Sequence, residues 1–170
     1  MLMFKIGDSV VHPQHGVGYV VKLEDRQFEA GVTRRYYEVF IPGGSTVWVP
    51  VDLAATGLRR LAARSDLVKC RKILVSRPSP LSDDARFRQS ELTARLNQGT
   101  IAAHCEVVRD LSAYGSDRPG NRTIAGLLRV TQEVLRQEWA MVEEITVSEA
   151  GQEIDSLLEK SRLTLSEAET

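Results

Sequence analysis

The stretch that decides the fold is FKIGDSVVHPQHGVGYVV, residues Phe4 to Val21. Its apolar residues are spaced as in short strands, and the segment from Pro13 to Gly18 has the composition of a tight turn. We therefore predict two strands, at about Ser9–His12 and Gly18–Lys22, which open a small, strongly bent β-barrel. A barrel of this kind more often serves as a docking module than as a catalytic domain.

The following residues continue as strands separated by short turns. Residues Val20 to Phe28 alternate charged and apolar side chains, and Arg34 to Ile41 is dense in aromatic and β-branched residues, which favour strands. After the turn Pro42–Ser45, residues Thr46 to Val49 return as another strand. Five short strands suit a barrel whose closure protects its edges. We assign residues 1–57 to a Tudor- or SH3-like β-barrel.

From residue 58 the pattern becomes helical. A helix is predicted from Ser65, as its N-cap, to Val75, and two prolines within Arg77–Leu81 end that helix and stiffen a linker. Residues 58–81 are therefore assigned to a helix and a linker, and residues 82–170 to an all-helical domain. Its helices are expected at Ser82 or Asp83 to Asn97, Thr100–Ala113, Thr123–Glu144 and, as an acidic segment, from Ser148 onward. The predicted fold class is α+β with more than one domain.

Composition describes an ordinary soluble chain. The 170 residues are 42% hydrophobic and 26% charged, with a formal net charge of −1. No apolar run approaches the length needed to span a bilayer, and the N-terminus lacks the pattern of a secretory signal. We therefore expect a cytoplasmic protein that does not enter a membrane.

Nothing in the sequence points to catalysis, a metal or a cofactor. Cys70 and Cys105 are too few for a disulfide framework or a four-ligand zinc site, and His12 and His15 have no third ligand nearby. No glycine-rich phosphate loop and no nucleophile motif is present. We expect two reduced thiols, no cofactor, no bound metal and no enzyme activity.

Charge is distributed unevenly along the chain. The net charge is +5 over residues 1–80, +1 over residues 81–136 and −7 over residues 137–170. Polyanions would therefore approach the N-terminal part of the chain and be repelled by the C-terminal part.

Two basic surfaces are candidates for function. The β-rich part carries Arg26, Arg34, Arg35, Tyr36, Tyr37 and Trp48. A basic, aromatic strand edge of this kind is suited to pairing with a partner strand, and the alternative is a core tryptophan with solvated arginines.

The helical part carries Arg86, Arg88, Arg95, Arg118, Arg122 and Arg129. These arginines could hold phosphates along a DNA backbone, and the alternative is a helix bundle with ordinary surface arginines.

The motif F-K-I-G-D-x-V-V-H-P-x-H-G-V-G at the N-terminus resembles the start of the CarD/CdnL family of bacterial RNA polymerase-binding transcription regulators. The same module occurs as the polymerase-interacting domain of transcription-repair coupling factors. The resemblance implies docking on the lobe of the RNA polymerase β subunit by strand pairing. Arg26 stands where the family often has a contacting arginine, and Trp48 falls at a position that is basic or aromatic in the family. The implied polymerase-binding residues are Arg26, Arg34, Arg35, Tyr37 and Trp48.

The resemblance also extends into the helical part, through Gly99 and the stretch Glu106–Leu111. It implies that this domain contacts promoter DNA at the upstream edge of the bubble, through the minor groove. Many family members place a tryptophan wedge near the start of the domain's first helix, and that position is Ala85 here. Phe87, two residues on, is interpreted as a core residue. The implied DNA-binding residues are Arg86, Arg88, Arg118, Arg122 and Arg129.

The function that the resemblance implies is a transcription regulator that docks on the polymerase β subunit and modulates the promoter open complex through contact with upstream-fork DNA. An alternative from a different class is a polymerase-docking adaptor. Such an adaptor would recruit another protein through its helical domain, by way of the acidic C-terminal helix, and would not bind DNA.

Overall fold

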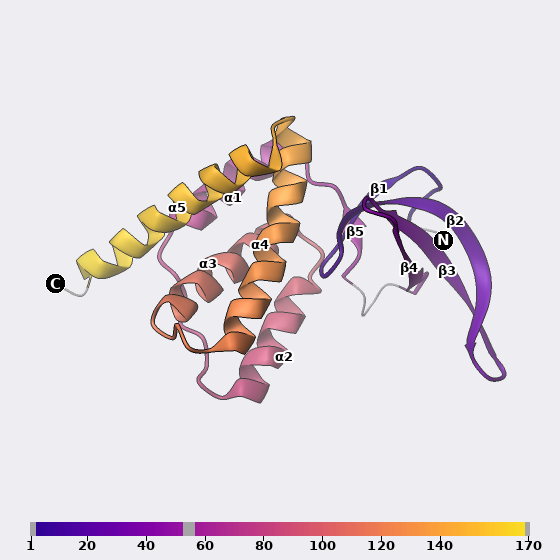
Figure 1. Ribbon diagram of the computed structural model, residues 1–170, viewed down its shortest axis with the longest axis horizontal. Coiled ribbons are helices and arrows are strands. Elements are labelled where there is room, and N and C mark those ends of the chain that lie inside the picture. The colour runs from indigo at the N-terminus through magenta and orange to yellow at the C-terminus, as the bar shows by residue number, and fades with distance from the viewer. Residues whose placement is uncertain (1–2, 53–56, 169–170) are drawn as a thin grey trace.

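A computed structural model describes residues 3–52 and 57–168, with side chains to residue 167. An antiparallel sheet occupies one end of the molecule and five helices occupy the other (Figure 1). The predicted α+β organisation, with a Tudor-like module followed by a helical region, is confirmed. Among the described residues, no helix has both the length and the apolar character needed to cross a membrane.

The sheet has five strands in the spatial order β4-β3-β2-β1-β5. The strands are β1 (Ser9–His12), β2 (Gly16–Glu29), β3 (Val32–Ile41), β4 (Ser45–Pro50) and β5 (Arg59–Arg60). Every paired strand runs antiparallel to its neighbour. The core of the sheet consists of Phe4, Val10, Val20, Tyr37, Val39, Val49 and Leu58. Within the described residues β4 and β5 do not pair with each other, so both remain edge strands.

Strand β2 is one long, bent strand where the sequence suggests two. Its register against β3 shifts between Val20 and Lys22 and again between Arg26 and Glu29. Irregularities of this kind increase local twist and bend the strand that carries them. The bend carries the far halves of β2 and β3 out as a hairpin arm, which curves away from the helices (Figure 1). Strand β5 is only two residues long and has no sequence signature of its own.

The helices are α1 (Arg64–Val75), α2 (Ala85–Leu96), α3 (Ile101–Ser116), α4 (Arg122–Glu143) and α5 (Val147–Ala168). All five were expected, but several ends differ by a few residues. Helix α1 begins before Ser65, which is therefore not its N-cap. The cap of α2 is Asp84, whose carboxylate accepts a hydrogen bond from the Phe87 amide at 2.8 Å. Helix α3 continues to Ser116, three residues beyond the predicted end at Ala113.

The helical core is divided into two clusters on either side of α3. The larger cluster joins α1, α3, α4 and α5 and includes Leu74, Trp139 and Ile154. Both cysteines, Cys70 and Cys105, are buried in it as free thiols. The smaller cluster joins α2 to α3 and to the start of α4. Helix α2 is therefore held by fewer neighbours than the other helices, and much of its surface faces outward.

A buried ion pair joins the sheet to helix α4. The Arg59 guanidinium on β5 donates hydrogen bonds of 2.7 and 2.5 Å to the two carboxylate oxygens of Glu138. The Glu138 side chain is fully buried, and it also accepts a hydrogen bond from the Ala62 amide at 2.8 Å. Removing one partner from such a pair leaves an uncompensated buried charge, which is strongly destabilising. We call this contact, together with the apolar cluster of Val11, Val17 and Val134 beside it, the seam.

The turn of the N-terminal motif also belongs to the seam. Gly16 has a φ of +83°, and a Cβ atom added there would overlap the end of the Gln137 side chain of α4. His12 stabilises the same turn, since its Nδ1 accepts hydrogen bonds from the amides of Gln14 and His15 at 3.1 and 3.2 Å. The positive φ explains the glycine at position 16, and Gln137 of α4 lies close against this turn.

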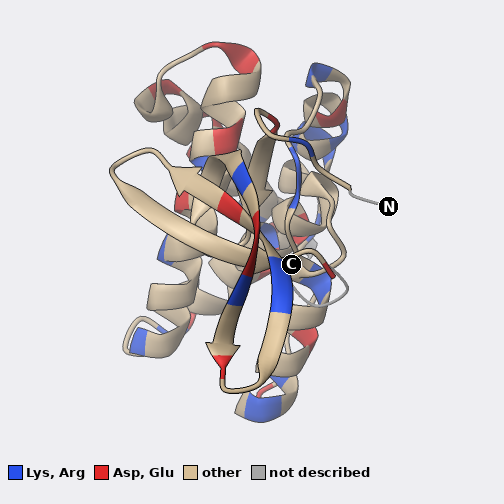
Figure 2. Cartoon of the chain, turned by 90° about the vertical axis from the view of Figure 1, so that its right-hand side faces the viewer, with Lys and Arg blue, Asp and Glu red and all other residues tan. Residues whose placement is uncertain are grey.

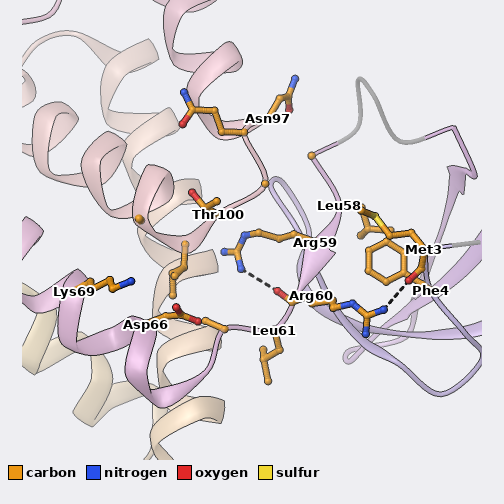
Figure 3. A pocket seen from close by; sticks show the side chains of 16 residues that line it. Met3, Phe4, Leu58, Arg59, Arg60, Leu61, Asp66, Lys69, Asn97 and Thr100 are labelled. Carbon is orange, nitrogen blue, oxygen red and sulfur yellow. Dashed lines mark hydrogen bonds between the residues drawn. The ribbon is translucent and has the colours of Figure 1, made fainter.

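An open cavity of about 660 Å³ lies beside the seam, between the N-terminal segment with β5 and the starts of α1 and α3 (Figure 3). Its charged groups are largely used within the fold. Arg60 donates a hydrogen bond to the Met3 carbonyl at 2.8 Å, and Asp66 accepts one from the Ala63 amide at 2.9 Å. The cavity separates the N-terminal segment from the starts of α1 and α3 beside the seam.

Candidate docking and nucleic-acid surfaces

Polar and aromatic side chains lie together on one face of the hairpin arm. In a strand, alternate residues point to opposite faces, and residues paired across strands share a face. The register pairs Glu24 with Tyr36, Arg26 with Arg34, and Glu38 with Trp48. Phe28 follows Arg26 at the same spacing along β2. We call the face that carries Glu24, Arg26, Phe28, Arg34, Tyr36 and Trp48 the outer face.

The centre of the outer face is a three-residue unit. One carboxylate oxygen of Glu24, Oε1, accepts a hydrogen bond from Arg26 Nε at 2.7 Å and another from Trp48 Nε1 at 3.2 Å. The Arg26 guanidinium lies 4.6 Å from the centre of the Trp48 ring, in cation–π geometry. The hydrogen bond from Arg26, and then that from Trp48, lowers the pKa of Glu24. The glutamate is therefore ionised at neutral pH.

Two further aromatic rings extend this unit toward the tip of the arm. The Phe28 ring stands perpendicular to the Tyr36 ring at 5.0 Å and lies 6.2 Å from the Trp48 ring. Phe28 is 58% exposed, although it is a large apolar side chain. An exposed aromatic group with an adjoining arginine has the composition of an interface hot spot.

The edge of the sheet beside the outer face is open. Strand β4 pairs with β3 on one side, and no other strand among the described residues pairs with its opposite edge. The outward amide and carbonyl groups of such an edge can extend the sheet by pairing with an added strand. Trp48 lies on β4 itself, so a strand added there would run next to the outer face.

The predicted docking residues divide between the two faces of the sheet. Arg26, Arg34 and Trp48 lie together on the outer face. Arg35 points to the other face and pairs with Asp25 at 3.1 Å. The prediction for Tyr37 is wrong, because this side chain is 1% exposed and its hydroxyl accepts hydrogen bonds from the backbone amides of Met3 and Phe4. Its neighbour Tyr36 takes the exposed position.

The hairpin arm carries both positive and negative residues and is not predominantly basic. Positive and negative residues are interleaved along it, as the view onto the sheet shows (Figure 2). Arg26 pairs with Glu24 and Arg35 pairs with Asp25, so two of the three arginines are neutralised within the arm. This surface therefore suits a protein partner better than a polyanion.

In the helical half, three of the predicted arginines remain available. Arg86 on α2 and Arg122 and Arg129 on α4 are exposed. No hydrogen bond or ion pair joins their side chains to another described residue. A shallow groove between α2 and the start of α4 is lined by Ala85, Arg86, Gln89, Ser90, Thr93 and Thr123. Small and polar side chains on its floor leave room for a sugar–phosphate backbone.

The other two predicted arginines make contacts within the fold. The burial of Arg88 contradicts its prediction as a DNA contact, whereas Arg118 is partly exposed and stays a predicted contact. Arg88 is buried and donates hydrogen bonds to the Ser82 carbonyl and the Tyr114 hydroxyl, both at 3.0 Å. Arg118 lies 3.7 Å from the centre of the Tyr114 ring and pairs with Asp83 at 3.1 Å. Both side chains attach the start of α2 to the end of α3. Arg95 is similarly occupied, with the buried Asp110 at 2.8 Å.

The interpretation of Phe87 as a core residue is also wrong. Phe87 is 63% exposed and lies in the first turn of α2, next to Arg86. Ala85 is exposed at the start of the same helix. The helical stripe of α2 buries Arg88 and Leu92 instead, so Phe87 points away from the bundle. The first turn of α2 therefore offers an aromatic ring and a cation to solvent.

Sequence reasoning did not name Glu24 and Phe28 as site residues. Both follow from the alternation that predicts β2, because positions 24, 26 and 28 share one face of a strand. Arg59 and Glu138, which make the seam, are 79 residues apart and carry no local signal.

Comparisons with known proteins match two successive parts of the chain. Residues 4–62 match the CarD-like/TRCF RID domain, and residues 69–155 match the CarD C-terminal domain. The chain is also similar to YdeB of Bacillus subtilis (strain 168), which is described as a candidate transcription factor. The identity is 26% over 148 residues, and the similarity covers 85% of this chain and 95% of YdeB.

Proposed function

The chain belongs to the CarD family, and from that premise we propose that it regulates transcription by docking on the RNA polymerase β subunit and contacting promoter DNA at the upstream edge of the bubble. The observation that carries the docking part is the Glu24–Arg26–Trp48 unit, which reaches an open sheet edge through Trp48. These side chains are held in place before any partner is bound.

Docking is proposed to use two kinds of contact at once. A strand of the β subunit would pair with the free edge of β4, where the main chain supplies affinity. The rings of Phe28, Tyr36 and Trp48 beside that edge would supply apolar contact area and selectivity. Because Glu24 neutralises Arg26 on the outer face, the proposed partner surface needs little negative charge opposite that arginine.

DNA contact is proposed for the first turn of α2 and the start of α4. Arg86 and Arg122 would bind backbone phosphates, and Arg129 would extend the contact along α4. The exposed Phe87 ring would stack on a base where the duplex is already open, since Ala85 offers no ring. With roughly three phosphate contacts, the logarithm of affinity should fall with the logarithm of salt concentration with a slope of about −2 to −3.

Two observations favour the adaptor alternative. Arg88 and Arg118, which would have strengthened a DNA surface, are engaged within the fold. In addition, Leu163 is 57% exposed on the acidic helix α5, where it offers an apolar contact to another protein. Under this alternative, α5 would be the functional surface of the helical half.

A gel shift with a pre-melted promoter fork distinguishes the two functions. The proposed function predicts that the full chain binds the fork weakly alone and more tightly with RNA polymerase present, because docking raises the local concentration of the helical half. Phe87→Ala should weaken the ternary complex by about five- to a hundredfold, the range expected for loss of one base–aromatic stack. If RNA polymerase binds the fork with the same affinity alone, with the parent chain and with the Phe87→Ala variant, the adaptor alternative is favoured.

A further inference from the structure

We propose that Glu24 is a positioning residue for docking: it holds Arg26 and Trp48 as one stacked unit, and the polymerase β subunit recognises that unit rather than a free arginine. This inference rests on the proposed function and assigns to Glu24 a role that acts through Arg26 and Trp48. Three observations support it.

The first observation is the sharing of one oxygen atom. Glu24 Oε1 accepts hydrogen bonds from Arg26 Nε and from Trp48 Nε1, which come from two strands that are not neighbours in the sheet. The other oxygen, Oε2, lies 3.8 Å from Lys22 Nζ. A carboxylate fixed from several sides has few alternative orientations, so it also fixes the groups that donate to it.

The second observation is the register of the arginines. Arg26 on β2 lies directly opposite Arg34 on β3. Like charges directly opposite in a sheet repel each other. Glu24, one pleat away on the same face, draws the Arg26 guanidinium toward Trp48 and away from Arg34. Without the carboxylate, the repulsion would favour other rotamers of Arg26, and the stack on Trp48 would be lost.

The third observation is the position of Trp48 at the edge of the sheet. Trp48 lies on an edge strand and is only partly buried, with Arg26 over its face and Phe28 at 6.2 Å. Its indole N–H has Glu24 as acceptor. A large side chain that is already immobilised before binding loses less conformational entropy when the partner arrives. Glu24 therefore increases affinity by preorganisation.

The experiment uses the full chain labelled with 5-fluorotryptophan, which gives one fluorine resonance for each of its two tryptophans, Trp48 and Trp139. Trp139 is fully buried and reports whether a variant is folded. The variants are Glu24→Ala, Glu24→Gln, which retains a hydrogen-bond acceptor, and Glu29→Ala as a matched control. Glu29 is an exposed carboxylate on the same strand. Calorimetry then measures the affinity of each variant for purified RNA polymerase β subunit.

We expect Glu24→Ala to shift and broaden the Trp48 resonance alone and to weaken β-subunit binding by about tenfold, a loss typical of an interface residue. Glu24→Gln should restore most of both properties, and Glu29→Ala should resemble the parent chain. The proposal would be overturned if Glu24→Ala left the Trp48 resonance or the affinity for the β subunit unchanged. Tighter binding by Glu24→Ala would also overturn it, because the β subunit would then prefer a free Arg26. If the parent chain itself does not bind the β subunit, the docking function fails and the role of Glu24 fails with it.

Discussion

Two arginine–glutamate pairs in this molecule use the same chemistry in opposite surroundings. At the seam, the Arg59 and Glu138 side chains are 10% and 0% exposed. On the outer face, the Arg26 and Glu24 side chains are 40% and 23% exposed. Hydrogen bonds of similar length join both pairs, 2.7 Å from Arg26 Nε and 2.7 and 2.5 Å from Arg59. The difference between them is access to water.

That difference determines what each pair can do. A buried pair cannot lose one partner without leaving a charge in a low-dielectric interior, so it fixes how the halves are joined. An exposed pair contributes little to stability, because water screens both charges. Its side chains remain available to a partner, so it can define a surface. The seam therefore has a structural role, and the outer face has a role in recognition.

The largest effect is expected from breaking the seam. Glu138→Ala removes the acceptor of both Arg59 and the Ala62 amide, and should lower the free energy of unfolding by about 3–5 kcal/mol. Urea denaturation followed by circular dichroism measures this change. The double variant Arg59→Met with Glu138→Leu should recover most of the loss, since it leaves no unpaired charge. A single variant as stable as the parent would show that the seam is not what joins the halves.

The matching change on the outer face should affect binding and leave folding intact. Arg26→Glu places a second carboxylate beside Glu24 and removes the stack on Trp48. Affinity for the RNA polymerase β subunit, measured by calorimetry, should fall about 30-fold, as for a hot-spot residue. The control is Arg35→Glu, on the opposite face of the same arm, which should change affinity far less. Equal losses in the two variants would mean that the partner does not distinguish the two faces.

A smaller effect is expected from pH, which should change the stability of the fold and leave binding by the outer face unchanged. Burial, reinforced by His15, lowers the pKa of His12 to about 4, and burial also lowers the pKa of His104. Because these pKa values are lower in the folded chain, the unfolded chain binds the protons at a higher pH than the folded chain does. Stability should be at its full value above about pH 6.5 and fall toward pH 5, by at most about 1.4 kcal/mol per pH unit for each histidine.

Urea denaturation at pH 7, 6 and 5 measures this slope. His12→Asn should reduce the slope by the contribution of one histidine, because an asparagine oxygen can also accept hydrogen bonds from the amides of Gln14 and His15. Stability that is constant from pH 7 to pH 5 would contradict the lowered pKa values of these two histidines. Because the pKa of Glu24 is lowered, β-subunit binding should be unchanged over the same range.

Local pattern predicted the elements well and the directions of side chains less well. The strands and helices followed from turn residues, aromatic and β-branched runs, and helical spacing. Tyr36 and Tyr37 show the limit: neighbours in a strand point to opposite faces, so one of them had to be buried, and composition does not say which. The register with β4 and the contacts of the Tyr37 hydroxyl with the N-terminal backbone decide it.

The misassigned residues of α2 have a similar cause. Arg88 is buried because Tyr114 and the Ser82 carbonyl provide partners for its guanidinium, and Tyr114 lies 26 residues away. With Arg88 and Leu92 on the buried stripe, Phe87 is left outside. An apolar pattern does not reveal an arginine that is buried by specific hydrogen bonds.

The most direct test of docking is hydrogen–deuterium exchange of the full chain with and without the RNA polymerase β subunit. We predict slower exchange in β4 (Ser45–Pro50) and in the Glu24–Phe28 stretch of β2 when the β subunit is present, because an added strand would pair the free edge and cover the outer face. Exchange in the seam should not change. Protection confined to the helical half, or none at all, would contradict the account.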